Sequence, residues 1–217
     1  MARKRNTGTE AKIKAAFTQL LKEKGFDSMT VSDIARIAGI NRGTFYMHYM
    51  DKFDLRQQLL DNALFDLQRI LREAEPGAPA PESGAAPSAG TPAARAAALR
   101  QRASVLDVIA PQSTLAALRY IRNDAAFFDA VTHSGQDMTM YEKTKKLLRK
   151  LLEEKAELMH IRPSLSEIPR EYGTEVVVSS VTSIIWLWVR RGFVETPEEI
   201  TRYIEINKRM TPLSLLR

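Results

Sequence analysis

The sequence predicts an all-α protein in which a small three-helix unit precedes a larger helical domain. Apolar residues recur at three- and four-residue spacing along most of the 217 residues, as they do on amphipathic helices. Residues that cap helices, such as Thr30 and Thr196, stand in front of these periodic segments. Glycines that suit a helix end follow them, at Gly25, Gly39 and Gly192.

Length and composition narrow the class of protein. A chain of 217 residues with 44% hydrophobic content can form one large or two small domains with a real core. No apolar run is long enough to span a bilayer, and Arg3, Lys4 and Arg5 lead into a polar helix instead of an apolar leader. The absence of cysteine excludes a disulfide framework and thiolate metal sites. We therefore expect a cytoplasmic protein without membrane, metal or cofactor.

Positive charge is concentrated at the start of the chain. Residues 1–60 hold 11 Lys and Arg against 6 Asp and Glu, whereas residues 61–217 hold 21 against 20, within a net charge of +6. Such a basic region is expected to bind phosphate in a salt-dependent way. Arg3, Lys4 and Arg5 could reach a DNA backbone or minor groove, or form an unstructured basic start, and both interpretations stay open.

The first three helices follow from their caps. The opening helix is expected to begin near Thr7 or Thr9 and to run to Lys24, with Gly25 as its end. Thr30 caps a second helix that ends at Gly39, where the chain must turn sharply, and Asn41 caps a short third helix. Two short capped helices separated by a glycine turn are typical of a helix-turn-helix.

The third helix has the residues that a recognition helix needs. A helix in the major groove requires hydrogen-bond donors at its N-terminal end, a small residue for close approach and phosphate contacts at its edge. Arg42, Gly43 with Thr44, and the flanking Tyr46, His48 and Lys52 meet these needs in turn. The alternative is an ordinary helical hairpin with a polar outer face. The candidate DNA-binding residues are Thr30, Asn41, Arg42, Gly43, Thr44, Tyr46, His48 and Lys52, with Arg3, Lys4 and Arg5.

This segment resembles the N-terminal domain of the TetR family of transcriptional regulators. The family pattern is Gly-aromatic, then Thr-Val-x-x-Ile-Ala-x-x-Ala-Gly, then Gly-Thr-x-Tyr-x-x-aromatic, then Lys-x-x-Leu. The chain matches it at Gly25-Phe26, Thr30-Val31, Ile34-Ala35, Ala38-Gly39, Gly43-Thr44, Tyr46, Tyr49, Lys52 and Leu55. Two departures are small: Tyr49 stands where Phe is commoner, and Met50 occupies a turn position that is usually polar.

A long fourth helix is expected to connect two domains, residues 1–52 and 53–217. Asp51 caps it and its apolar positions continue to about Ala74, so it can act as a lever between the domains. Beyond it, residues 75–94 are rich in Pro, Ala and Gly and lack large apolar side chains, which predicts a disordered insertion. A short helix from Leu99 to Ile109, closed by Pro111, is expected to follow.

The remaining chain reads as helical throughout. Short helices are expected around residues 115–121 and after Asn123-Asp124, and a long one from about Gln136 to Met159. The lysines and arginines of residues 143–150 indicate a solvated face rather than a second DNA site. The next helix, from Pro169 to about Arg191, is apolar almost all round and must be covered on more than one side. A final helix begins at Thr196-Pro197.

The C-terminal half resembles, more loosely, the dimerising helices of TetR regulators related to the dihydroxyacetone kinase operon regulator. The matching features are Tyr172, the apolar helix with Trp186-Leu187, Gly192-Phe193 and Thr196-Pro197-Glu198-Glu199. Candidate dimer-interface residues are Val177, Val181, Ile184, Trp188 and Tyr203. Candidate walls of a ligand pocket, for which plain core packing is the alternative, are Phe127, Phe128, Met138, Tyr141, Tyr172 and Trp186.

The resemblance implies a ligand-responsive regulator, most often a repressor, that binds a palindromic operator as a homodimer and is released by a small molecule. An enzyme is the first alternative, but the three histidines are not at metal-ligand spacing and no phosphate loop or nucleophile elbow is visible, so no catalytic residue is expected. A sequence-independent DNA-packaging protein is the second. It would bind any duplex with similar affinity, whereas a regulator should prefer its own operator.

Overall fold

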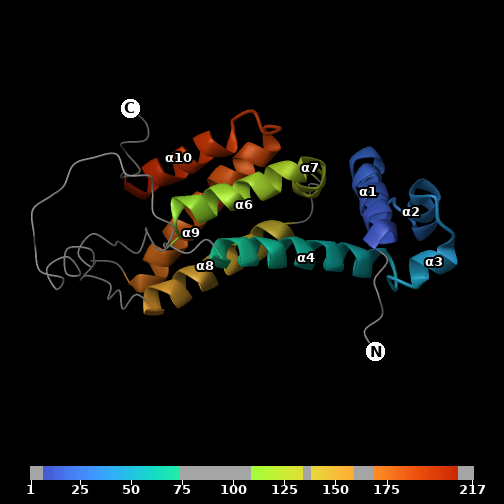
Figure 1. The fold of residues 1–217 in the computed structure, drawn as a ribbon, viewed down its shortest axis with the longest axis horizontal. Coiled ribbons are helices and arrows are strands. Elements are labelled where there is room, and N and C mark those ends of the chain that lie inside the picture. Colours follow the sequence, from blue (N-terminus) through green and yellow to red (C-terminus); the bar gives the residue numbers. More distant parts are fainter. Residues whose placement is uncertain (1–6, 74–108, 134–137, 159–168, 210–217) are drawn as a thin grey trace, which may run out of the picture.

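The computed structural model describes residues 7–73, 109–133, 138–158 and 169–209, and within these ranges the chain is helical with short turns (Figure 1). The predicted insertion at 75–94, Arg3, Lys4 and Arg5, and all of the predicted 99–109 helix except Ile109 lie outside the described residues. The helices are α1 Thr7–Lys24, α2 Val31–Ala38, α3 Arg42–Tyr46, α4 Lys52–Glu73, α6 Pro111–Asn123, α7 Ala125–His133, α8 Thr139–Leu158, α9 Arg170–Arg190 and α10 Pro197–Arg209.

The predicted all-α fold is confirmed, with one shift at Pro111. This proline was expected to close a preceding helix, but it occupies the first turn of α6 instead. Proline is well suited to that position, because the first amides of a helix have no intrahelical partner. The predicted long helix begins at Thr139 in the structure, and residues 134–137 are outside the described ranges.

Helices α1, α2 and α3 form a small unit around a shared core at one end of the molecule (Figure 1). Ile13 and Phe17 of α1, Ile34 of α2 and Phe45 of α3 are fully buried there. The chain leaves α1 at Gly25 with φ 76°, a backbone conformation that favours glycine. The unit thus packs its apolar stripes inward and leaves the opposite sides of α2 and α3 free.

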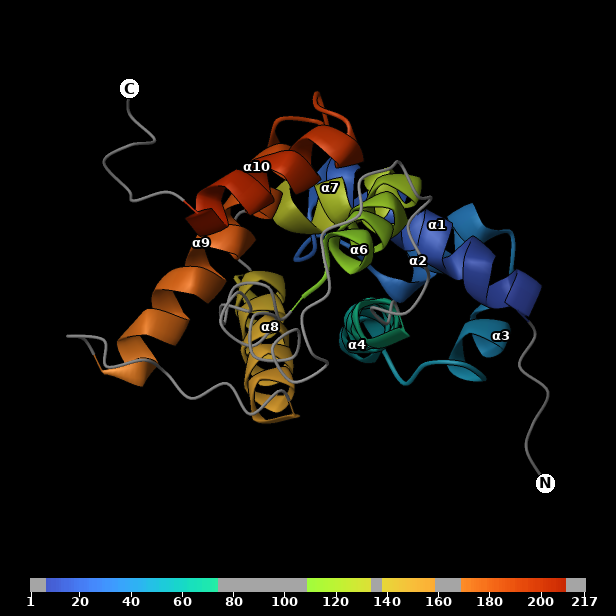
Figure 2. The same cartoon turned by 60° about the vertical axis from the view of Figure 1, so that its left-hand side comes forward.

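Helix α4 joins this unit to the larger helical group. It runs from the end of α3 alongside α6 and α8 (Figures 1 and 2). Three polar contacts fix it there: Asp66 accepts a hydrogen bond from Tyr120 (3.1 Å), Asp61 from Lys143 (2.8 Å) and Glu154 from Arg72 (2.7 Å). Burial and the neighbouring Asp66 carboxylate raise the pKa of Tyr120, so the phenol remains a donor to α4.

A second connection between the two groups runs from α1 to α7. Lys14 pairs with Asp124 at the start of α7, and Lys22 pairs with Asp129 at 2.5 Å. The ammonium of Lys14 also lies 4.6 Å from the ring centre of Phe127. We call these contacts the α1–α7 seam. Its ion pairs are part-exposed, so each contributes little in isolation and is weakened by salt.

Helix α9 lies in the larger group with α7, α8 and α10 as neighbours (Figure 2). Its C-terminal end is held by the indole of Trp188, which donates to the carbonyl of Glu195 at 2.8 Å. The chain reverses through Gly192 and Phe193, both with positive φ, and Arg122 of α6 donates to the Phe193 carbonyl at 2.7 Å. Thr196 and Glu199 then cap α10 reciprocally.

Candidate nucleic-acid interface and an apolar cavity

The start of α2 is fixed by a reciprocal cap. The Thr30 hydroxyl accepts from the Asp33 amide at 3.2 Å, and the Asp33 carboxylate accepts from the Thr30 amide at 3.1 Å. Hydrogen bonds from Lys24 and from Thr30 lower the pKa of Asp33 from 3.8 to about 2. Helix α2 ends at Gly39 with φ 64°, where an L side chain would be strained. These features set the angle at which α3 leaves the turn.

Asn41 caps α3 and Gly43 makes room for that cap. The Asn41 side-chain oxygen accepts from the amide of Thr44 at 2.7 Å and from its hydroxyl at 3.0 Å. A Cβ at Gly43 would lie 3.3 Å from the same oxygen, closer than most real Cβ contacts. Gly43 therefore supports the helix start in addition to allowing close approach of another molecule. Only the second of these roles was expected from the sequence.

Helix α3 presents one side to the core and the other to solvent. Phe45 and Tyr49 are buried and anchor it from beneath. On the outer side Arg42 and Gly43 are exposed, and Tyr46 and Met47 have exposed fractions of 49% and 61%. The Arg42 guanidinium donates to the Tyr46 hydroxyl at 3.4 Å. This outer side offers a short row of donors to a groove-shaped partner.

Lys52 and His48 are more engaged with the protein than the sequence suggested. The Lys52 ammonium donates to the carbonyls of Phe26 (3.1 Å), Asp27 (2.9 Å) and Met29 (2.9 Å), which uses all three of its N–H bonds. It ties the start of α4 to the loop before α2. His48 lies largely covered beside α1, with Nδ1 3.5 Å from a carboxylate oxygen of Glu10. Both side chains thus have partners within the protein, and their phosphate contacts stay a prediction.

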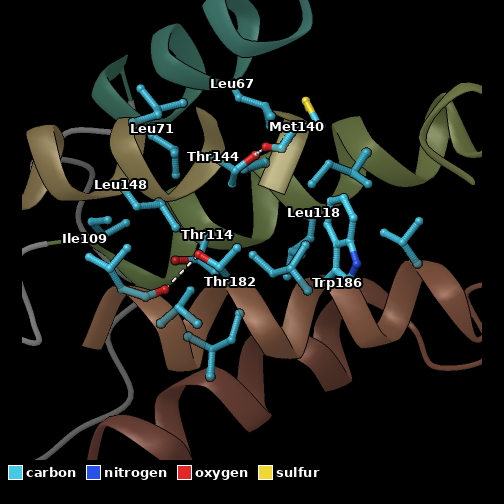
Figure 3. A pocket seen from close by; sticks show the side chains of 18 of the residues that line it. Leu67, Leu71, Ile109, Thr114, Leu118, Met140, Thr144, Leu148, Thr182 and Trp186 are labelled. Carbon is cyan, nitrogen blue, oxygen red and sulfur yellow. Dashed lines mark hydrogen bonds between the residues drawn. The ribbon is translucent and has the colours of Figure 1, made fainter. Parts of the chain in front are cut away.

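An apolar cavity of about 100 Å³ lies among the helices of the larger group (Figure 3). Helices α4, α6, α7, α8, α9 and α10 all contribute to its walls. Figure 3 shows Leu67 and Leu71 of α4 on one side and Thr182 and Trp186 of α9 on the other. The cavity therefore touches the helix that leads directly to α3.

The predicted pocket residues divide into two sets. Phe128 and Trp186 line the cavity. Phe127 is buried under Lys14, and Tyr141 packs edge-on against Trp186 at a ring-centre distance of 5.3 Å without lining the cavity. Met138 and Tyr172 have exposed fractions of 54% and 69%, so their side chains point to solvent. The sequence missed most of the aliphatic wall and its threonines Thr114, Thr132, Thr144 and Thr182.

The predicted dimer-interface residues are also redistributed. Val177 and Val181 line the cavity, and Ile184 is half-buried against the core. Trp188 is only 1% exposed and fills the core of its own protomer, so a partner cannot reach it. Tyr203, on α10, remains on the surface at 38%.

A different stripe of α9 faces outward. Tyr172, Val176 and Leu187 have exposed fractions of 69%, 60% and 59% and recur at helical spacing on one side. By length and composition the segment Glu171–Arg190 could cross a membrane. Core helices pass the same test, and this one lines the cavity and holds Glu175 in ion pairs with Lys145 and Arg149 of α8. We name Tyr172, Val176 and Leu187 with Tyr203 and Ile206 of α10 the outer apolar face.

Comparison with family models and curated relatives gives two ranges of similarity. The model for bacterial regulatory proteins of the tetR family matches residues 13–59, and a model for a transcriptional regulator C-terminal region matches residues 110–207. An uncharacterized HTH-type transcriptional regulator of Haemophilus influenzae is 38% identical over 64 residues, and the HTH-type transcriptional repressor BepR of Brucella suis is 35% identical over 66. These matches cover 30% of this chain and 31% and 32% of the relatives.

Solved structures share the fold over nearly the whole chain. A TetR-family regulator from Syntrophomonas wolfei aligns with a TM-score of 0.60 at 12% identity, covering 94% of this chain and 95% of that one. The dihydroxyacetone kinase operon activator DhaS aligns with a TM-score of 0.57 at 16% identity, covering 93% and 94%. The family models, the relatives and the shared fold agree, and this chain belongs to the TetR family of DNA-binding transcriptional regulators.

Proposed function

We propose that this protein is a ligand-responsive repressor that binds a palindromic operator as a homodimer and is released by a small-molecule effector. Residues 1–52 are its DNA-binding domain and residues 53–217 its regulatory and dimerisation domain. One curated relative is named a repressor, which supports this sign of regulation, whereas the structural neighbour DhaS is named an activator and is similar in fold alone. A cytoplasmic location and a role without catalysis follow from the family.

The observation that carries the proposal is the double attachment of α4. Leu67 and Leu71, towards its C-terminal end, form part of the cavity wall. At its N-terminal end Lys52 donates hydrogen bonds to three carbonyls of the loop that precedes α2. A molecule that moves this wall therefore moves the unit that carries α3. Effector and operator are then coupled through one helix, and the coupling is reciprocal.

The small size of the cavity supports a movement of the surrounding helices when an effector occupies it. A cavity of about 150 Å³ in another protein holds benzene, and this one is smaller at about 100 Å³. An effector larger than this volume displaces part of the surrounding wall. Because packed interiors resist continuous deformation, the helices shift as bodies.

The outer apolar face is the proposed dimer surface. Large apolar side chains that cluster on an exposed face mark interaction sites, and α9 and α10 are the helices that the family resemblance assigns to dimerisation. A two-fold pairing through this face presents two copies of α3. In helix-turn-helix dimers such copies enter successive major grooves about 34–36 Å apart.

Selection of bound duplexes from a random pool tests the proposal. We expect a two-fold symmetric consensus with half-sites one helical turn apart, and an affinity at least ~10³-fold above that for unrelated duplex at equal salt. Arg42→Ala should relax the preference at one position in each half-site, whereas Lys12→Ala, an exposed change on α1, should leave the consensus unchanged. Equal binding of all duplexes would instead indicate a DNA-packaging protein.

The sign of regulation needs a separate measurement. Transcription in vitro from a promoter that contains the selected operator should fall when the protein is added and recover when an effector is supplied. An increase on addition of protein would identify an activator and leave the operator assignment intact.

A further inference from the structure

The chemistry of the cavity wall limits what the effector can be. The wall is almost entirely aliphatic and aromatic, and its hydroxyl groups are four threonines on four different helices. Each of these hydroxyls donates to a carbonyl of its own helix or of the residue just before it. The donor–acceptor pairs are Thr114 to Ala110 (3.3 Å), Thr132 to Asp129 (3.0 Å), Thr144 to Met140 (2.7 Å) and Thr182 to Val178 (2.7 Å).

These bonds leave few donors for a ligand. A threonine hydroxyl has a single hydrogen, so a threonine that donates to the backbone can only accept from a ligand. Among the described lining residues, the remaining side-chain donors are the indole of Trp186 and the ammonium of Lys208. Lys208 is the single charged side chain of that lining.

Lys208 is held at the end of the cavity next to Ile109. Its side chain is 7% exposed, and its Nζ donates to Glu205 Oε1 at 2.6 Å and to the carbonyl of Ile109, another lining residue, at 3.3 Å. An ammonium has three hydrogens, and these two contacts use two of them. Among the described residues no further acceptor of this ammonium is found, which leaves the third hydrogen for an acceptor that enters the cavity.

Glu205 determines the charge that such an acceptor should carry. Its side chain is 17% exposed and balances the charge of Lys208. An anionic ligand would approach a pair that is already neutral and would face the Glu205 carboxylate in a poorly solvated site. A neutral carbonyl or ether oxygen accepts the third hydrogen without this repulsion. We propose that the effector is an uncharged, largely apolar molecule with one hydrogen-bond acceptor, which Lys208 binds.

This inference rests on one part of the proposed function, namely that the effector binds in this cavity. Calorimetry with three probes tests it: cyclohexanone, methylcyclohexane and cyclohexanecarboxylate. A hydrogen bond to a charged donor corresponds to about tenfold or more in affinity. We expect Lys208→Met to weaken cyclohexanone binding by at least that factor and to leave methylcyclohexane binding unchanged. Arg202→Met, an exposed change on the same helix, should alter neither.

Two further variants separate the neighbouring possibilities. Glu205→Gln leaves Lys208 unbalanced, so it should strengthen binding of the carboxylate and not of the ketone. Trp186→Phe removes the other donor. Because Lys208 is still present, this variant should still bind the ketone more tightly than the other two probes. These variants keep the assignment testable if Lys208→Met does not fold, which circular dichroism would show.

Several results would overturn the assignment. These are tighter binding of the carboxylate than of the ketone by the unaltered protein, a ketone affinity that depends on Trp186 alone, and no binding of any probe. Failure of the proposed function has a different signature. In that case the ketone would bind through Lys208 as expected, but it would not change the affinity of the protein for its selected operator.

Discussion

The α2–α3 unit and helix α9 differ in how much of their structure is encoded locally. Polar caps and a glycine fix both ends of α2 and the start of α3, at Thr30, Gly39 and Asn41. Helix α9 also has clear ends, at Pro169 and Gly192, but its middle is apolar or small on every side. The comparison shows that helix ends can be read from single residues. The rotation of a helix about its axis can be read only if one side is polar.

The largest difference should appear between adjacent residues of α9. Trp188 is 1% exposed and Leu187 is 59% exposed. Trp188→Ala should reduce the free energy of unfolding by about 3–5 kcal/mol, because it removes a fully buried aromatic side chain. Leu187→Ala should change it by less than about 0.5 kcal/mol in the monomer. Urea denaturation measures both, and similar losses would show that α9 is rotated differently.

The outer apolar face gives the second test. Val176→Asp should weaken the dimer by about a hundredfold or more, since it would bury an unpaired charge at the interface. The matched change Val194→Asp is in the turn before α10, where the side chain is 71% exposed, and should have no such effect. Light scattering across a dilution series distinguishes them. A dimer that tolerates Val176→Asp would move the interface to another surface.

Lys52 provides an intermediate effect in the N-terminal unit. Lys52→Met leaves three carbonyls without their donor and should cost about 1–3 kcal/mol of unfolding free energy. A phosphate contact predicts a different result, namely unchanged stability and a shallower salt dependence of DNA binding. Thermal denaturation together with a salt titration of operator binding decides between them. Lys12→Met on the exposed side of α1 serves as the reference.

The smallest effect is the pH dependence of the α2 cap. The pKa of Asp33 is about 2 in the folded protein against an ordinary value of 3.8, so the folded state favours its ionised form. This contribution is complete above the unfolded value and is lost as the pH falls towards the folded one. The Tm difference between the native protein and Asp33→Asn should therefore shrink between pH 5 and about pH 2. A difference that stays constant would show that the cap does not depend on the charge.

Much of the fold could be predicted from the sequence, because caps, glycines and helical spacing act over a few residues. The ends of α1 at Gly25 and of α2 at Gly39 are of this kind. The position of Lys52 could not be predicted, since its partners Phe26, Asp27 and Met29 are more than 20 residues away. Only the folded loop brings their carbonyls together.

The candidate site was predicted well at α3 and poorly at α9, because the sequence shows local spacing but not long-range packing. The exposed side of α3 follows from the buried positions Phe45 and Tyr49, four residues apart. In α9, however, Val177 and Val181, predicted for the interface, line the cavity, and Tyr172, predicted for the cavity, lies on the surface. The useful signal was Thr182, because a hydroxyl in an apolar helix can bond to its own backbone and still face an interior.

The α1–α7 seam also affects how ionic strength acts on this protein. Added salt competes with the protein for DNA phosphates, and it also screens Lys14 from Asp124 and Lys22 from Asp129. This screening weakens the connection between the unit of α1, α2 and α3 and the larger helical group. The slope of log affinity against log salt therefore combines ion release from DNA with the loss of internal rigidity. Neutralising Asp124 and Asp129 by Asn would separate the two contributions.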